Sequence, residues 1–377
     1  MTDTLDRNYP VSTGDARQGR YVLQPVSDGV TLIRLQGLPP VPEVLDVLDA
    51  ELGEGAATID SFLYPCPYPC PATEPMEVPP GTTTPYPPPA GEVLPGQCDG
   101  EGVSVSIVDT GLLPGTATTA HSWLAGVTGT LEDPYYPGTR QILPYAGHGT
   151  FVAGCLRCMA PKAEVLVVQG FDSGTGKFES DLEPVLEAAL DPAPDIFVFT
   201  FVSATRKDLS LKTFDDLYDR RIRHILGLVV IVPAGNDGTS RQMWPAAYPW
   251  TVSVGALSAS WRHRAHFSNY GAWVDVYTPG EDLINAFAVG DYVCTEPPIG
   301  AQRFFDGMAM WSGTSFSTPV FAGLVAARMS GSGEDGRQAA AALLQLARSQ
   351  EVPGIGPVLY PGQGCLHPEE DRQPAAT

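Results

Sequence analysis

VSVSIVD, residues 103–109, is the segment from which the fold class is most directly predicted. Its run of β-branched and aliphatic residues, ending in an acid, is typical of a strand buried on both faces of a parallel sheet. Comparable apolar runs follow at AEVLVVQGF (163–171), DIFVFTFV (195–202) and GLVVIVPAG (227–235), with segments of helical pattern such as GTFVAGCLRCM (149–159) between them. This alternation predicts an α/β fold: a doubly wound, mostly parallel sheet with helices on both faces.

Three further parts of the chain surround that predicted sheet. Residues 1–62 contain two strand-like runs around the turn signal SDG (27–29), then a helical pattern, which predicts a small α+β hairpin–helix module. Residues 63–98 are so rich in proline that they form either a stiff extended linker or a segment wrapped over the surface. We assign the sheet to a domain at residues 99–360 and a flexible tail to 361–377.

Composition and charge limit the classes of partner. The chain of 377 residues carries 22 basic and 43 acidic residues, a formal net charge of −21, and 43% hydrophobic residues. The hydrophobic content is that of a globular protein, and the negative charge repels nucleic-acid phosphates and anionic lipids. We therefore expect neither a nucleic acid nor a membrane as partner, and the oligomeric state stays open. The N-terminal segment lacks the pattern of a secretory signal and no long apolar run follows, so a cytoplasmic location is expected.

The cysteines leave two questions open. Cys155 and Cys158 form a C-x-x-C pair, a spacing found in redox and zinc sites. No second pair stands at zinc-ribbon spacing, and these two fall one helical turn apart in a segment rich in small residues, so we favour free thiols. Cys66 and Cys70 bracket the sequence CPYPC, where the prolines favour an extended chain. A local disulfide and free thiols are both compatible with that segment.

Three short segments present an acid, a histidine and a serine in contexts that suit catalysis. Asp109 ends the strand of SIVDTG, at the edge where ligands of doubly wound folds bind. His148 stands between two glycines in AGHGTFVAG (146–154), so we expect an exposed imidazole that can act as a base. Ser315 lies in the tight turn of GTSFSTPVFAG (313–323), where a helix dipole favours negative charge. Because a serine needs a histidine to take its proton and a carboxylate to orient that histidine, the three residues predict nucleophilic catalysis.

The order Asp109, His148, Ser315 is also the order in subtilisin. With the signatures SIVDTG, GHGTFVAG and GTSFSTPVFAG, the chain resembles the subtilase family of serine proteases over about residues 99–346. A fourth segment, VVIVPAGNDG, is similar to the family's oxyanion-hole segment. The resemblance implies that Asn236 and the Ser315 backbone N–H donate to the oxyanion of the transition state. Sedolisins share the Gly-Thr-Ser turn but have an aspartate at the oxyanion position, so His148 and Asn236 favour the subtilisin branch.

The resemblance also implies a groove in which a peptide adds as an extended strand. The specificity side of this groove would be formed by Thr200, Phe201, Val202, Ala234 and Gly235. The other edge would be QGFDSGTG (169–176), near Gly174. The family usually has Ser-Leu-Gly where this chain has Thr-Phe-Val, so Val202 places a β-branched side chain beside the primary pocket. Either Val202 narrows the specificity, or the strand shifts to make room for it.

The function implied by the resemblance is that of a serine endopeptidase acting inside the cell on a limited set of peptides or proteins. Two alternatives stay open: a catalytically silent peptide-binding module, and an esterase or peptide ligase with the same triad. The chemistry requires no cofactor. Family members often bind structural Ca²⁺, which the acidic composition allows, but no metal ligand can be assigned. Residues 1–62 are either a prodomain-like segment that assists folding and blocks the groove, or a module that recruits a partner.

Overall fold

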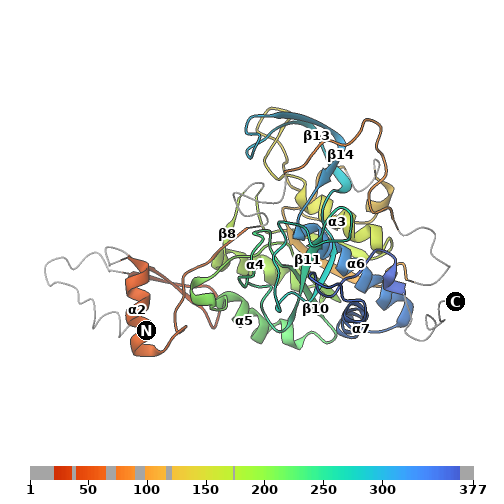
Figure 1. The fold of residues 1–377 in the computed structure, drawn as a ribbon. Coiled ribbons are helices and arrows are strands. Elements are labelled where there is room, and N and C mark those ends of the chain that lie inside the picture. Colours follow the sequence, from red (N-terminus) through yellow and green to blue (C-terminus); the bar gives the residue numbers. More distant parts are fainter. Residues whose placement is uncertain are drawn as a thin grey trace.

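A central sheet organises the computed structural model, which describes residues 21–35, 40–64, 74–89, 98–115, 121–172 and 175–365. Each hydrogen-bonded pair of neighbouring strands in this seven-stranded sheet is parallel. In order the strands are β12 (Val276–Pro279), β11 (Thr251–Leu257), β10 (Val229–Pro233), β9 (Ile196–Phe199), β4 (Ser104–Asp109), β7 (Glu164–Gln169) and β5 (Thr128–Gly129). The doubly wound α/β prediction is confirmed, since the four apolar runs form β4, β7, β9 and β10 (Figure 1).

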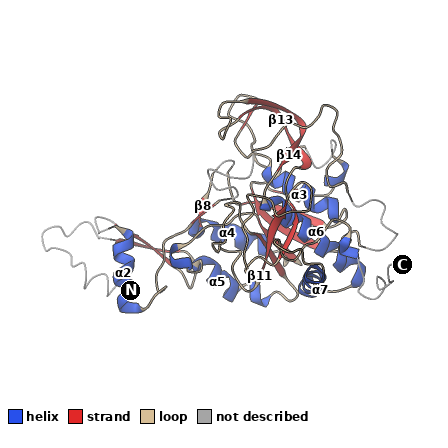
Figure 2. Cartoon of the chain, viewed as in Figure 1, coloured by secondary structure: helices blue, strands red, loops and turns tan. Residues whose placement is uncertain are grey.

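Alternate side chains of the strands point into two cores, one on each face of the sheet. In β9, Ile196 and Val198 belong to one core, whereas Phe197 and Phe199 belong to the other. The first core includes residues of α3 (His148–Met159), α6 (Thr314–Ser332) and α7 (Gly336–Ser349), and the second includes residues of α4 (Glu179–Leu190) and α5 (Lys212–Arg220). Helices therefore cover both faces, with the strands between them (Figure 2).

Strand β4 lies where the chain reverses its direction across the sheet. After β4 the chain reaches β7 on one side through α3, and then β9 on the other side through α4. At such a switch point the loops beyond the carboxyl ends of the strands diverge and leave room for a ligand. Asp109 is the last residue of β4 and is therefore placed at that edge.

A long antiparallel hairpin stands above the central sheet in Figure 1. It consists of β13 (Leu283–Val293) and β14 (Gln302–Trp311), and β13 also pairs with the short β6 (Gln141–Ile142). Residues 74–89 of the proline-rich segment run along this hairpin: the backbones of Met76 and Met310 exchange two hydrogen bonds, as do those of Tyr86 and Ile284. The described part of the segment is thus wrapped on the surface rather than an open linker.

The buried carboxylate of Glu74 anchors the start of this wrapped segment. Its Oε1 atom accepts hydrogen bonds from the Tyr292 hydroxyl at 3.0 Å, the Thr295 N–H at 2.9 Å and the Thr295 hydroxyl at 2.7 Å. Arg303 donates to the carbonyl oxygen of the next residue, Pro75, at 2.6 Å. Hydrogen bonds to a charged group are stronger than neutral ones, so these contacts tie the segment to the hairpin.

The N-terminal module has the hairpin and the helix expected from its sequence. Strands β1 (Tyr21–Pro25) and β2 (Thr31–Leu35) pair antiparallel, and α2 (Val41–Leu52) ends at Gly53, whose φ of 96° suits glycine. One side of α2 buries Val44, Leu45 and Leu48 in a small core of its own. In Figure 1 the module extends from the side of the molecule that carries α4 and α5.

Helix α4 begins differently from its sequence pattern. The spacing of Ser180 and Glu183 predicts a capping box with Ser180 as the N-cap. This prediction is wrong: the N-cap is Phe178, and it makes no side-chain cap. The N-terminus is capped from the N-terminal module, because Asp60 accepts the Ser180 N–H at 3.1 Å and its hydroxyl at 2.6 Å. A carboxylate there also complements the helix dipole.

The cysteines of α3 agree with the sequence-based prediction, whereas the start of the C-terminal tail does not. Cys155 and Cys158 are buried free thiols, as predicted, and burial raises the pKa of each, that of Cys158 to about 12. Cys66 and Cys70 lie outside the described residues. Gln363–Cys365 form a 3₁₀ turn (η5) against α6, so the prediction of a flexible tail is wrong for residues 361–365. The later residues of the tail are not described.

Candidate active site

The side chains of Asp109 and His148 meet at the carboxyl end of β4. His148 is the first residue of α3, and the preceding Gly147 takes a left-handed conformation with a φ of 84°, which favours glycine. Gly149 lets α3 approach the end of β4 and the residues that follow it, since a Cβ atom there would lie 2.4 Å from the Gly111 carbonyl oxygen and 3.1 Å from Asp109 Oδ1. The two glycines beside His148 therefore bring its ring against the strand that carries Asp109.

The Asp109 carboxylate orients the imidazole of His148. Its two oxygens lie 2.8 and 2.9 Å from His148 Nδ1. The backbone N–H of Thr110 donates to Oδ1 at 2.6 Å, and the hydroxyl of Thr200 donates to Oδ2 at 2.5 Å. Because these neighbours are donors, the ionised carboxylate suits the site, and Nδ1 carries the proton that faces it. The lone pair of the neutral ring is then on Nε2.

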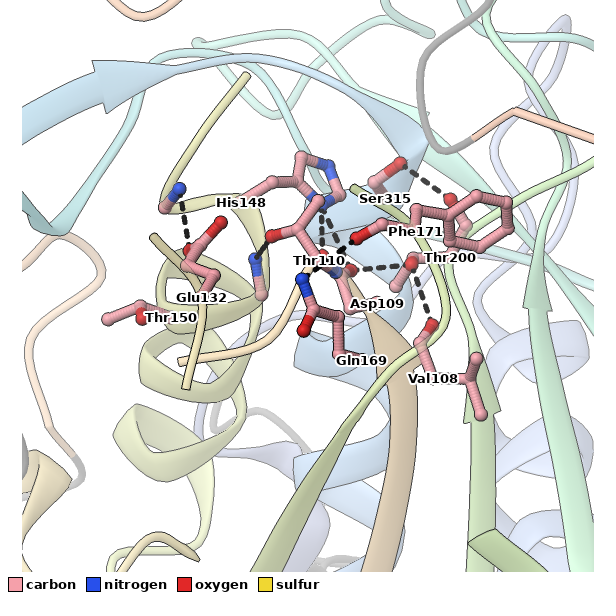
Figure 3. A network of polar contacts seen from close by, with 12 residues as sticks. Val108, Asp109, Thr110, Glu132, His148, Thr150, Gln169, Phe171, Thr200 and Ser315 are labelled. Atoms are coloured by element: carbon pink, nitrogen blue, oxygen red, sulfur yellow. Dashed lines mark hydrogen bonds and ion pairs between the residues drawn. The ribbon is translucent and has the colours of Figure 1, made fainter. Parts of the chain in front are cut away.

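Ser315 lies on the other side of the histidine ring, in the first turn of α6. Figure 3 shows the ring of His148 between the two residues, with one edge toward Asp109 and the opposite edge toward Ser315. The Ser315 hydroxyl donates to the carbonyl oxygen of Thr200 at 3.3 Å. Nε2 of His148 is buried and has no hydrogen-bond partner in the described part of the chain. This nitrogen can therefore accept a proton from a reacting hydroxyl.

Aromatic side chains enclose the histidine. His148 is fully buried, at 0% exposure, so the expectation of an exposed imidazole is wrong. The ring of Trp311 lies edge-on at 5.4 Å between centroids, and that of Phe316 lies at 5.1 Å. These residues flank the Gly-Thr-Ser turn, so the segment that carries Ser315 also covers the ring of His148. Shielding from water strengthens the electrostatic interactions inside such a site.

Asn236 is held next to the Ser315 turn by Thr314. The Oδ1 atom of Asn236 accepts the backbone N–H and the hydroxyl of Thr314, both at 2.8 Å. The Thr314 hydroxyl in turn accepts the N–H of Gly235 at 3.1 Å. With its oxygen fixed in this way, the amide directs Nδ2 toward Gly313, where a Cβ atom would lie 3.6 Å from it. The arrangement places an N–H donor beside the Gly-Thr-Ser turn.

The part of the chain that forms this site matches the sequence model of a protein family. The model of the "Subtilase family" matches residues 100–353, more than half of the chain. The chain belongs to the subtilase family. The chain is 30% identical to Subtilisin-like protease 2 of Arthroderma benhamiae over 247 residues, which cover 61% of this chain and 51% of the relative. Subtilisin-like protease 2 of Trichophyton rubrum is 29% identical over 253 residues, with the same coverage. This subtilase thus spans about half the length of the curated relatives it matches.

Solved structures to which the chain is similar include those of two proteases. The prenylagaramide maturation protease PagA has a TM-score of 0.47 and 24% identity, with 65% of this subtilase and 83% of that chain covered. A cold adapted subtilisin-like serine proteinase has a TM-score of 0.47 and 20% identity, with 70% and 90% covered.

Two hydroxyl contacts of this subtilase site are absent from the sequence-based prediction. The resemblance places Thr200 in the substrate groove, whereas in the structure its hydroxyl contacts Asp109 and its carbonyl oxygen contacts Ser315. Thr314 orients Asn236, a role that the sequence does not predict. The signal for Thr314 is its place inside the Gly-Thr-Ser turn, whereas the contact of Thr200 joins residues far apart in sequence and depends on the parallel pairing of β4 with β9.

The residues predicted for the specificity side of the groove lie together, but their side chains differ in role. Phe201 is fully buried, with its ring 5.0 Å from that of Phe171, so its side chain belongs to the core. Val202 and Ala234 are also buried, at 3% and 0% exposure. Gly235 has a left-handed φ of 97° immediately before Asn236. Gly174, predicted at the opposite edge, lies outside the described residues.

A strand of the same chain lies along the predicted groove. Phe62–Leu63 (β3) pairs antiparallel with Lys177–Phe178 (β8), which follow the predicted groove edge in sequence. On its other side, Tyr64 forms an antiparallel bridge with Val202, whose N–H donates to the Tyr64 carbonyl oxygen at 3.3 Å. Leu63 is completely buried in the core of the sheet domain. Residues 62–64 therefore have the contacts of an added central strand.

Charged groups join the N-terminal module to the sheet domain. Arg206 donates to Asp46 at 2.8 Å and to Asp49 at 2.9 Å, and Lys207 donates to Asp49 at 3.0 Å. The hydrogen bonds from Lys207 and Arg206 lower the pKa of Asp49 to about 2. Glu179 accepts the N–H of Ser61 at 3.4 Å, and burial raises the pKa of Glu179 to about 7. The module is thus docked by complementary charge beside the groove strand.

In the described ranges, no group of three or more His, Cys, Asp or Glu side chains lies together in a way that could hold a metal ion. Calcium binding therefore stays a prediction with no assigned ligand. Among the described helices, none combines the length and the apolar character that crossing a bilayer requires.

Proposed function

We propose that this subtilase is a serine endopeptidase that hydrolyses a limited set of peptide or protein substrates. The observation that carries the proposal is the state of His148: Nδ1 lies 2.8 Å from Asp109, and Nε2 is buried, unpartnered in the described part of the chain, and directed toward Ser315. This arrangement suits a general base for a serine nucleophile. The metal-free triad chemistry needs no cofactor. A cytoplasmic location stays a prediction.

The proposed reaction proceeds through an acyl-enzyme. Ser315 Oγ attacks the substrate carbonyl carbon while His148 Nε2 takes the hydroxyl proton, and Asp109 stabilises the imidazolium that results. Asn236 Nδ2 and the Ser315 backbone N–H donate to the oxyanion. Collapse of the tetrahedral intermediate breaks the C–N bond, and His148 gives its proton to the leaving amine. Water then attacks the acyl-enzyme with His148 again as base, which releases the acid and restores the serine.

Residues 21–64 are proposed to cover the groove in the manner of a prodomain. Support comes from the two sides of β3, which pairs with β8 on one side and bridges to Val202 through Tyr64 on the other. A substrate that adds as a strand would need to pair with the same backbone groups, those of β8 and Val202. Substrate and the N-terminal segment would then compete, so catalysis requires that residues 62–64 leave this position.

Digestion of a peptide library tests the proposed function. Full-length wild type and the Ser315→Ala variant would be incubated with the library and with simple esters, and the products identified by mass spectrometry. An endopeptidase cuts internal peptide bonds, and the variant does not. Turnover of esters alone, or joined peptides, would favour the acyl-transfer alternative. No turnover of any substrate by the wild type, or by the Asp49→Lys variant in which the docking of the N-terminal module is weakened, would favour a catalytically silent module.

Weakening the docking of the N-terminal module should raise activity. Asp49→Lys places a third cation beside Arg206 and Lys207, so we expect faster hydrolysis of a short peptide by the full chain and faster trypsin cleavage within residues 21–64. The matched control is Glu43→Lys, an exposed position on the same helix. The hydrogen bonds from Lys207 and Arg206 lower the pKa of Asp49 from its ordinary value of 3.8 to about 2. The contribution of the Asp49 carboxylate to docking is therefore fully present above pH 3.8 and is lost as the pH falls through 2. Equal rates for wild type and Asp49→Lys would contradict the covering role.

Removing the oxyanion donor should slow the chemical step. Asn236→Ala is expected to lower kcat by about 10²–10³-fold with little change in KM, a size known from the equivalent change in subtilisin. Thr314→Val should have a smaller effect of the same kind, because it removes the hydroxyl that fixes the Asn236 amide. Steady-state kinetics with one peptide measures both. An unchanged kcat in Asn236→Ala would exclude this residue from the mechanism.

A further inference from the structure

A buried glutamate outside the triad holds the start of α3. Glu132 is 3% exposed, and its Oε1 atom accepts the backbone N–H of Gly147 at 2.8 Å. Gly147 is the N-cap of α3 and directly precedes His148. Figure 3 shows the Glu132 carboxylate beside the first turn of this helix. The side chain therefore fixes the backbone from which the proposed general base extends.

The backbone of Glu132 is in turn fixed to the segment that follows β4. Its N–H donates to the Leu112 carbonyl oxygen at 2.9 Å, and the Leu112 N–H donates to the Thr130 carbonyl oxygen at 2.8 Å. A Cβ atom on Gly111 would lie 3.3 Å from the Glu132 Cβ atom, so the two segments pack closely. Glu132 thus joins the chain just beyond β4 to the start of α3.

The loop before His148 has a backbone conformation that needs such restraint. Tyr145 and Gly147 both have a left-handed φ, of 59° and 84°, and for a tyrosine this region is uncommon. The Tyr145 hydroxyl donates at 2.5 Å to Oε1 of the buried Glu296, which lies between β13 and β14. Residues in sparsely populated conformations persist where their surroundings over-determine them, often at functional sites. Two buried carboxylates from different parts of the chain therefore hold this loop.

We propose that Glu132 is a positioning residue for His148, an assignment that rests on the proposed function. Asp109 restrains the ring of His148 through Nδ1, whereas Glu132 restrains its main chain through Gly147. Without an acceptor for the Gly147 N–H, the first turn of α3 is free to shift, and the imidazole shifts with it. Proton transfer requires hydrogen-bond geometry, and a misplacement of about 1 Å can cost roughly 100-fold in rate.

Substitutions at Glu132 test the proposal in the full-length chain that also carries Asp49→Lys, so that weakened docking of the N-terminal module is common to all proteins. Glu132→Ala removes the acceptor, and we expect kcat for one peptide to fall by about 10–100-fold with KM nearly unchanged. Glu132→Gln keeps an oxygen that can accept the Gly147 N–H, so its kcat should stay within about threefold of the Asp49→Lys parent. Asp133→Ala, at the exposed neighbouring carboxylate, is the matched control and should leave kcat at the parent value.

Proton NMR follows the His148 ring without a substrate. The Nδ1 proton gives a downfield signal when it is held in a short hydrogen bond to the carboxylate of Asp109. We expect this signal in the parent and in Glu132→Gln, and its loss or shift in Glu132→Ala, while thermal unfolding stays cooperative. Tyr145→Phe releases the loop at its other anchor and should also weaken or shift the signal, so the proposal remains testable if Glu132→Ala does not fold.

An active parent whose kcat and NMR signal are unchanged in Glu132→Ala would overturn the inference and leave the proposed endopeptidase intact. A fall in kcat with an unchanged signal would also overturn it, because His148 would not have moved. Equal loss of activity in Glu132→Gln and Glu132→Ala would exclude the acceptor role. Hydrolysis of the peptide by none of the proteins, the parent included, would overturn the proposed function and this inference with it.

Discussion

Ser315→Ala is expected to lower kcat by about 10⁶-fold, the size known for the same change in subtilisin. The variant keeps the oxyanion donors and the groove but has no atom that can attack the carbonyl carbon. KM should change little, because the hydroxyl contributes to the transition state rather than to substrate binding. The measurement is single-turnover hydrolysis of one peptide at saturating enzyme, followed until the slow variant has released product.

Ser317→Ala is the matched control for that change. Ser317 is also buried in the first part of α6, and its hydroxyl donates to the Thr314 carbonyl oxygen at 2.9 Å. The Ser317→Ala change removes a serine hydroxyl from the same helix but leaves the proposed nucleophile in place. The kcat of this variant should therefore stay close to that of wild type. A Ser315→Ala enzyme as active as the Ser317→Ala enzyme would refute Ser315 as the nucleophile.

Asp109→Asn is expected to lower kcat by about 10⁴-fold, as the equivalent change does in a trypsin-type triad. The groups around the carboxylate are donors: the Nδ1–H of His148, the N–H of Thr110 and the hydroxyl of Thr200. An asparagine has one acceptor oxygen, so its NH₂ must face one of these donors or force His148 into the other tautomer. The proton would then sit on Nε2, which could no longer accept the proton of Ser315.

An effect of the wrong His148 tautomer on kcat can be distinguished from a loss of stability. Thermal unfolding of Asp109→Asn should remain cooperative, and its small residual activity should respond to pH differently from that of wild type. Thr200→Val serves as the comparison, since it removes one donor to the carboxylate and leaves the charge in place; its effect should be much smaller. A kcat for Asp109→Asn equal to that of Thr200→Val would show that the carboxylate is not the orienting group.

The central sheet was predictable because its signal is local. Each buried strand of the doubly wound sheet is a short run of aliphatic residues, and Asp109 directly follows such a run in β4. The positions of His148 and Ser315 follow from equally local motifs with glycines at fixed places. The burial of His148 does not, because the covering ring of Trp311 comes from a hairpin far along the chain.

What the sequence does not reveal are contacts between distant segments. The start of α4 shows the reason: Ser180 has a good local capping pattern, but Asp60 of the N-terminal module competes for the same N–H and hydroxyl. In the same way, proline content predicts that residues 63–98 lack a core, yet it cannot show that Glu74 finds three donors on and beside β13. Such partners are determined by tertiary packing, not by spacing.

Covalent labelling with a fluorophosphonate probe tests the central claim most directly, because the probe reacts with a serine hydroxyl whose proton is taken by a neighbouring base. The full-length wild type and the Asp49→Lys variant would be labelled, and the modified residue identified by tandem mass spectrometry. We predict a single label on Ser315 in both proteins, faster in Asp49→Lys and abolished by His148→Ala. A folded Asp49→Lys protein that stays unlabelled, or that carries the label on another serine, would contradict the assignment of the active site.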